Sequence, residues 1–101
     1  MSGHAVFAML ICELHLPAAR SLKEKRRVVR SLVDRLHKRF RVSIAETDHH
    51  DLHQRSQISI AVVEQGVGRL ERLAQALRDA ADDYADAIVT RWDLEIVEFE
   101  G

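Results

Sequence analysis

Residues 5–16 alternate with a period of two, and the first half of the segment is apolar on both sides. One side carries Val6, Ala8, Leu10, Cys12, Leu14 and Leu16, and the other begins with Phe7, Met9 and Ile11. A strand that is apolar on both sides belongs in the interior of a sheet, where a covering layer and neighbouring strands bury it. Pro17 ends this strand. The rest of the chain must therefore supply the other strands and the cover.

A helix is predicted over residues 21–40. Ser21 and Glu24 form a capping box, in which a hydroxyl and a carboxylate satisfy free backbone donors at a helix start. Apolar side chains then recur at helical spacing and form one buried stripe: Leu22, Val29, Leu32, Val33, Leu36 and Phe40. This helix would pack its stripe on the sheet.

The remaining elements follow without a linker or a repeat. They are a strand from Val42 to about Thr47, a strand over Gln57–Val63, a helix opened by Gly66 and Gly68, and a strand over Ile88–Phe99. Two right-handed crossovers in the order β-α-β-β-α-β give a four-stranded antiparallel sheet with two helices on one face. We therefore predict one α+β domain of ferredoxin-like architecture over residues 1–101.

Composition fits a small folded domain. The 101 residues are 47% hydrophobic and 31% charged, and Cys12 is the only cysteine. A single cysteine forms no internal disulfide, which is typical of a reducing compartment. The apolar run at residues 5–12 is too short to cross a membrane and lacks the basic flank of a signal peptide. We expect a cytoplasmic protein with no membrane association.

Charge is strongly segregated along the chain. Ten of the fifteen Lys and Arg residues lie between Arg20 and Arg41 with only Glu24 and Asp34 among them, a net charge of +8. The remainder has five basic and fourteen acidic residues, a net charge of −9. Such a division predicts a polyanionic partner for the basic segment.

Several segments carry a family resemblance: residues 14–32, residues 42–46, and the pairs Asp51-Leu52 and Gln54-Arg55. Through them the chain resembles the YlxP-like family of small bacterial proteins, most specifically in the stretch SLKEKRRVVRSL. The resemblance implies a ferredoxin-like domain whose genes lie near those for translation initiation and ribosome maturation. It implies no catalytic residues. His53 stands where the family would lead us to expect an aromatic residue, usually Trp.

The basic helix is the leading candidate for a binding surface. On a helical wheel, Lys23, Arg26, Arg27, Arg30, His37 and Lys38 share the arc opposite the apolar stripe, and Asp34 is the only acidic residue among them. We expect six basic residues in and beside this helix to bind the backbone of RNA, either free or in a ribosomal particle: Arg20, Lys23, Arg26, Arg27, Arg30 and Lys38. Base stacking on the sheet is not expected, because the strand at residues 57–63 has no aromatic side chain.

Two other interpretations of this helix remain open. The basic arc can be a solvated surface without a partner, or it can meet an acidic protein or the acidic half of a second copy. The sheet face without helices also predicts an interface, since exposed apolar patches usually mark one. We expect a homodimer that uses Phe7, Met9, Ile11, Val63 and Val89.

A metal-dependent enzyme built on the polar segment at residues 48–53 is the remaining alternative. His49, His50 and His53 offer metal ligands, but adjacent residues of a strand point apart, so we predict a hairpin loop and no metal. Gly66-Val-Gly68 lacks the third glycine of a dinucleotide-binding loop, and we predict no cofactor and no small-molecule substrate. With Cys12 expected in the core, no catalytic constellation is left and we expect no enzyme.

Overall fold

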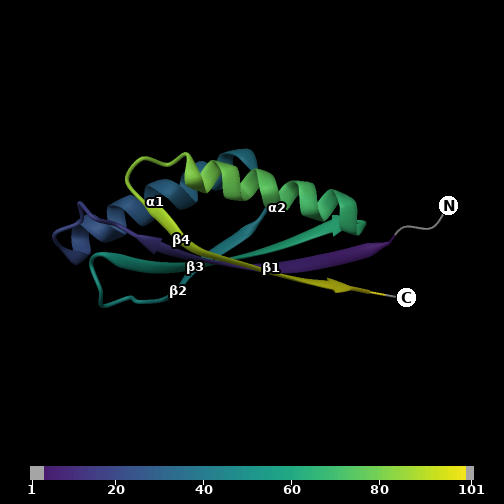
Figure 1. The fold of residues 1–101 in the computed structure, drawn as a ribbon, viewed down its shortest axis with the longest axis horizontal. Coiled ribbons are helices and arrows are strands. Elements are labelled where there is room, and N and C mark those ends of the chain that lie inside the picture. Colours follow the sequence, from purple (N-terminus) through teal and green to yellow (C-terminus); the bar gives the residue numbers. More distant parts are fainter. Residues whose placement is uncertain (1–3, 100–101) are drawn as a thin grey trace.

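The computed structural model describes residues 4–99 and contains six elements (Figure 1). In chain order they are β1 (Ala5–His15), α1 (Leu22–Arg39), β2 (Ser43–Asp48), β3 (Arg55–Gln65), α2 (Val67–Asp82) and β4 (Ile88–Glu98). The predicted order is confirmed. The largest difference is in β3, which extends two residues beyond each predicted end and so shortens the hairpin connection.

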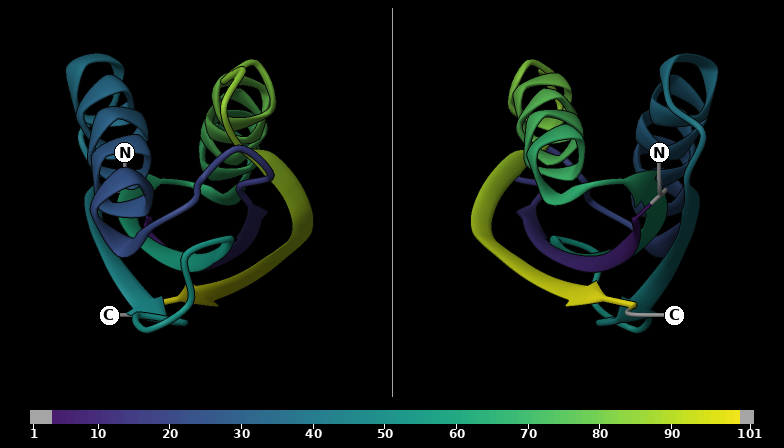
Figure 2. Two further views of the ribbon diagram at one scale, coloured as in Figure 1. Left: turned by 90° about the vertical axis from the view of Figure 1, so that its left-hand side faces the viewer. Right: turned by 90° about the vertical axis from the view of Figure 1, so that its right-hand side faces the viewer.

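The strands form one antiparallel sheet in the order β2-β3-β1-β4, and both helices cover the same face. Figure 2 shows the sheet curling beneath the helices, with α1 on the β2 side and α2 on the β4 side. This is the predicted ferredoxin-like arrangement. β1 is central, as its two-sided apolar pattern requires.

The core lies between the sheet and the helices. The predicted inner side of β1 is completely buried from Val6 to Leu16, and it meets side chains of β3, α1 and α2: Ile58, Ile60, Val62, Val29, Leu32, Leu36, Leu70, Ala74 and Leu77. Gly66 is the N-cap of α2, and its φ of +86° is one that residues with a side chain rarely adopt. That conformation explains the glycine between strand and helix without a bound cofactor.

Val89 does not lie where the sequence predicted. It pairs with the inward-facing Leu14 and packs against the core, so its assignment to the open sheet face is wrong. The cause is a β-bulge: Glu13 pairs with Arg91 and Leu14 with Val89, which leaves Thr90 as an extra residue. One extra residue reverses the side-chain alternation beyond it. Phe7, Met9, Ile11 and Val63 do lie on the open face.

The buried stripe of α1 contains a charged residue, Lys25, which is 0% exposed. Its Nζ donates to Glu46 Oε2 at 2.7 Å, to the His49 carbonyl at 2.9 Å and to the Arg55 carbonyl at 3.5 Å. The three hydrogen atoms of the ammonium thus have three acceptors. Lys25 thereby ties α1 to both ends of the β2–β3 connection.

Glu46 can meet Lys25 because it pairs with the inward-facing Ile58. The same carboxylate oxygen accepts a second hydrogen bond, from the buried Ser56 hydroxyl at 2.6 Å. Within residues 4–99, no buried side-chain nitrogen or oxygen lacks a partner. The polar network is therefore complete, which is the condition under which a buried charge is tolerated.

Replacing Lys25 with Met should lower the free energy of unfolding by about 3–5 kcal/mol, because Glu46 loses its cation and two carbonyls lose their donor. Chemical denaturation measures the change. Lys23→Met removes the same charge from an exposed site two residues away and should stay within about 0.5 kcal/mol of the native protein. Equal effects of the two substitutions would show that the Lys25 network contributes nothing.

Candidate nucleic-acid interface

The exposed side of α1 carries the basic residues that the sequence assigned to it. The capping residues fix where the helix begins, and the buried stripe fixes which side of it faces solvent. The Ser21 hydroxyl accepts from the Glu24 N–H at 3.1 Å, and the Glu24 carboxylate accepts from the Arg20 N–H at 2.6 Å. The second bond reaches one residue further back than in the standard capping box. All six predicted contact residues are exposed: Arg20, Lys23, Arg26, Arg27, Arg30 and Lys38.

These six cations have no carboxylate partner in the part of the chain that the structure describes. Among the described residues, the one Lys or Arg of α1 that forms a salt bridge is Lys25, which lies on the buried side of the helix. Asp34 lies on the same exposed face, and it forms no salt bridge with the described residues either. The positive charge is thus neither neutralised within α1 nor covered by the acidic side chains of β4.

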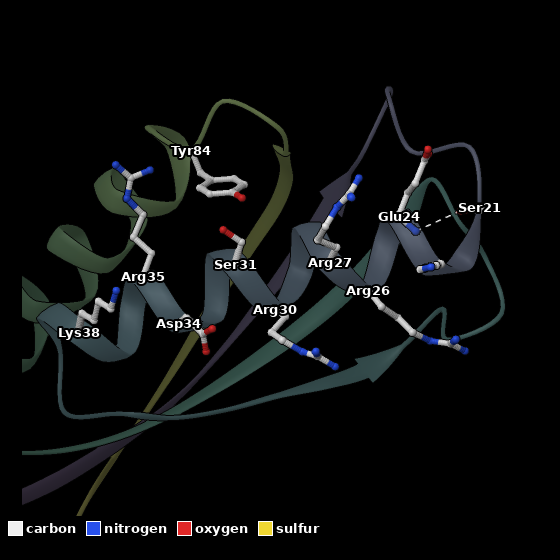
Figure 3. A pocket seen from close by; sticks show the side chains of 11 residues that line it. Ser21, Glu24, Arg26, Arg27, Arg30, Ser31, Asp34, Arg35, Lys38 and Tyr84 are labelled. Atoms are coloured by element: carbon white, nitrogen blue, oxygen red, sulfur yellow. Dashed lines mark hydrogen bonds between the residues drawn. The ribbon is translucent and has the colours of Figure 1, made fainter.

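An open hollow runs along this face and reaches the residues that follow α2 (Figure 3). Arg27, Ser31 and Arg35 extend toward Tyr84, whereas Arg26 and Arg30 extend to the other side of the helix. The Arg35 guanidinium lies 5.7 Å from the centre of the Tyr84 ring, a cation–π contact that holds this arginine in place. Most of the residues that line the hollow are cations, and the others are two serines, one aromatic ring and the two carboxylates of Glu24 and Asp34.

The start of α1 is already capped within the chain. The Ser21 hydroxyl and the Glu24 carboxylate accept from backbone N–H groups there, so the helix N-terminus is not an open anion site. The positive potential of this surface therefore comes from its exposed side chains, and several cations on one face attract phosphate groups.

The polar hairpin forms a second group of side chains, joined to β1. His49 Nε2 lies 3.1 Å from Glu13 Oε2, and Arg55 Nη2 lies 3.3 Å from the same histidine nitrogen. His50 instead donates from Nε2 to the Glu46 carbonyl at 3.2 Å. The histidines therefore do not converge, and no set of three or more His, Cys, Asp or Glu side chains among residues 4–99 is placed to hold a metal ion.

The buried Cys12 and the partly buried Glu46 have pKa values shifted in opposite directions. Burial raises the pKa of the Cys12 thiol to about 12, so this residue packs as a small hydrophobic side chain and offers no thiolate nucleophile. Burial also works to raise the pKa of Glu46, but the hydrogen bonds from Lys25 and Ser56 and the charge of Lys25 outweigh it. The pKa of Glu46 is therefore lowered from 4.5.

Sequence reasoning missed Lys25 and Glu46 as a pair. It identified the exposed cations by their helical spacing. Lys25 was not recognised as buried, because it is one of many basic residues in the same helix. One signal could have found it: Lys25 is three residues after Leu22 and four before Val29, so it fills the gap in the apolar stripe.

The sequence of the chain matches a known protein family. The family described as "Protein of unknown function (DUF503)" matches residues 7–97. The chain belongs to this family. "Uncharacterized protein YlxP" of Bacillus subtilis (strain 168) is 33% identical over 75 residues, which cover 74% of this chain and 82% of the relative. The YlxP-like resemblance is thereby confirmed.

A structural comparison supports the fold alone. The "De novo designed protein Foldit4" shares 8% sequence identity and aligns with a TM-score of 0.51 over 96% of this chain and 98% of its own. No helix in residues 4–99 combines the length and the apolar character needed to cross a membrane.

The lowered pKa of Glu46 predicts an acid-sensitive part of the stability. Its contribution is complete above the unfolded pKa near 4.5 and is lost as the pH falls through the lower folded value. The difference in unfolding free energy between the native protein and Glu46→Gln should therefore shrink as the pH falls below about 4.5. Chemical denaturation across this pH range tests it, with Glu71→Gln on the exposed side of α2 as control. A difference that grows in acid would contradict the assigned ion pair.

Proposed function

We propose that this protein is a non-enzymatic, cytoplasmic RNA-associated protein that contacts the RNA backbone through the exposed face of α1. The proposal rests on one observation: five exposed cations on one face of α1, and Arg20 just before the helix, have no carboxylate partner among residues 4–99. RNA provides a regular series of phosphates, and arginine binds phosphate through paired N–H groups.

Counterion release supplies the driving force. Each phosphate that a lysine or arginine neutralises frees a condensed cation, so affinity falls linearly with salt on a double logarithmic plot. Specific base reading is not part of the proposal, since the exposed aromatic residue of β1, Phe7, lies on the opposite side of the sheet from α1. Contact through backbone and shape suits a protein that associates with a structured RNA.

The translational setting is proposed from the family resemblance. The YlxP-like family is expected to have genes beside those for translation initiation and ribosome maturation, so we propose a role in one of these processes. The rival proposal is an acidic protein partner. Unpaired cations favour either polyanion, and the two are separated by whether the association survives ribonuclease.

Reversing three charges, Arg26→Glu, Arg27→Glu and Arg30→Glu, should abolish retention on ribosomes or ribosomal precursors. All three side chains are exposed, so the fold should persist and its circular dichroism should be unchanged. Co-sedimentation at increasing salt measures the effect, and the native protein should show a salt slope of about one for each phosphate engaged.

A matched control keeps the number of reversed charges but moves them to the other helix: Arg69→Glu, Arg72→Glu and Arg78→Glu on the exposed side of α2. This variant should co-sediment like the native protein. Normal retention of the α1 variant, or equal loss in both variants, would contradict the proposed surface. Retention that survives ribonuclease would favour an acidic protein partner.

We further propose that two copies associate through the apolar end of the open sheet face. Phe7 pairs with Val63 on one side and Val97 on the other, and these side chains are 49%, 75% and 42% exposed. A contiguous apolar row across three strands is unfavourable in water and usually marks an interface. Because both helices cover the other face, a two-fold dimer of this kind leaves both α1 surfaces free (Figure 2).

Val63→Glu should convert the dimer into a monomer, because it buries a charge in the paired faces without disturbing the core. Light scattering during size-exclusion chromatography measures the mass of each species. Gln75→Glu adds the same charge on the exposed side of α2 and should leave the dimer intact. A native protein that is monomeric at all concentrations, or a dimer that tolerates glutamate at this position, would refute this interface.

A further inference from the structure

Four exposed cations of α1 form two rows, and Lys23 lies between the rows near the start of the helix. Arg26 and Arg30 extend on one side of the helix, and Arg27 on the other, as Figure 3 shows. Lys38 follows Arg27 by about three helical turns and so continues the second row. Asp34 lies between the rows, four residues after Arg30 and four before Lys38.

The two rows point in different directions from the helix. Arg26 and Arg27 are successive residues, about 100° apart around the helix axis, so their long side chains diverge and can reach two separate lines of phosphates. A single strand is one line of phosphates and would engage one row at a time. The arrangement thus fits two backbones better than one.

The surface also lacks what single-strand binding needs. Proteins that hold single strands stack the bases on exposed aromatic rings along a basic groove. Among the described residues that line the hollow, Tyr84 is the one aromatic, and the Arg35 guanidinium lies over its ring. In a double helix the bases are already stacked on each other, so no such platform is required.

Asp34 bears on the choice between RNA and DNA. A carboxylate between two rows of cations repels any phosphate, yet it forms no salt bridge among residues 4–99 that would offset this. A 2′-hydroxyl can donate a hydrogen bond to a carboxylate. Such hydroxyls line the wide, shallow minor groove of A-form RNA. DNA offers no such donor in its minor groove walls.

From this geometry we infer that α1 binds double-helical RNA across the minor groove, with one row of cations on each strand and Asp34 toward the 2′-hydroxyls. The inference rests on the proposed RNA association and names the class of RNA. It requires that both rows contribute and that the duplex be preferred over its separated strands.

Fluorescence anisotropy with three probes of one sequence tests this: an RNA duplex, one of its strands made unable to fold, and the DNA duplex. We expect the RNA duplex to bind about tenfold more tightly than the single strand, the equivalent of two additional phosphate contacts at low salt. Equal or tighter binding of the single strand would overturn the inference while leaving the proposed function intact. Binding of none of the probes would refute the proposed function itself.

Two variants separate the rows. Arg26→Ala with Arg30→Ala removes one, and Arg27→Ala with Lys38→Ala removes the other. Each should reduce RNA-duplex affinity about tenfold and the salt slope by about two. Arg69→Ala with Arg72→Ala on α2 is the matched control and should change neither. A loss confined to one row would contradict the two-strand geometry.

Asp34→Ala tests the RNA assignment independently. Removing a carboxylate from a basic surface should strengthen the binding of the DNA duplex by electrostatics alone. If Asp34 accepts from 2′-hydroxyls, the same variant should bind the RNA duplex more weakly. Stronger binding of both duplexes would overturn the minor-groove placement.

Discussion

The contact between Lys25 and Glu46 joins the first helix to the edge strand β2 on its own side of the sheet, and the arrangement of the surface follows from it. Lys25 Nζ also donates to the carbonyls of His49 and Arg55, so one ammonium group holds both ends of the β2–β3 connection. A buried pair of charges contributes little net stability compared with apolar residues of the same size, but losing one partner is expensive. Its effect is therefore to select one packing of α1 over alternatives that would leave a charge unpaired.

The sequence of α1 allows other packings in which a different cation would face the core. Lys25 is followed directly by Arg26 and Arg27, and a rotation of the helix by one residue, about 100°, would bring another cation inward. The carboxylate of Glu46 and the Ser56 hydroxyl that orients it are matched to the reach of a lysine at position 25. With that side chain fixed inside, the remaining cations of α1 are directed outward. The interior pair thus determines the exterior surface.

Much of the fold could be predicted because its elements have clear periods. The two-sided pattern of β1 indicated a central strand, and the Ser21 cap and apolar stripe located α1 to within a residue. The failures have physical causes. Lys25 was left out of the buried stripe because a charged residue is rarely buried. Its pairing with Glu46 was missed because the two residues lie 21 positions apart in the chain. Val89 was misplaced because the bulge at Thr90 depends on pairing with β1, which no local pattern reveals.

The contrast between the two helices bears on why α1 stays so basic. α2 packs on the same side of the same sheet, yet it alternates charges and pairs Arg78 with Asp82 at 3.8 Å. On α1 the neighbours Lys23 and Arg27, and Arg26 and Arg30, repel each other by about 0.2–0.5 kcal/mol per pair, and the helix dipole adds to the strain at its first turns. Acidic residues at such positions would relieve this repulsion, as they do on α2, without touching the core. Packing and solubility therefore do not require the surface that α1 presents, whereas a partner dense in negative charge removes the repulsion when it binds.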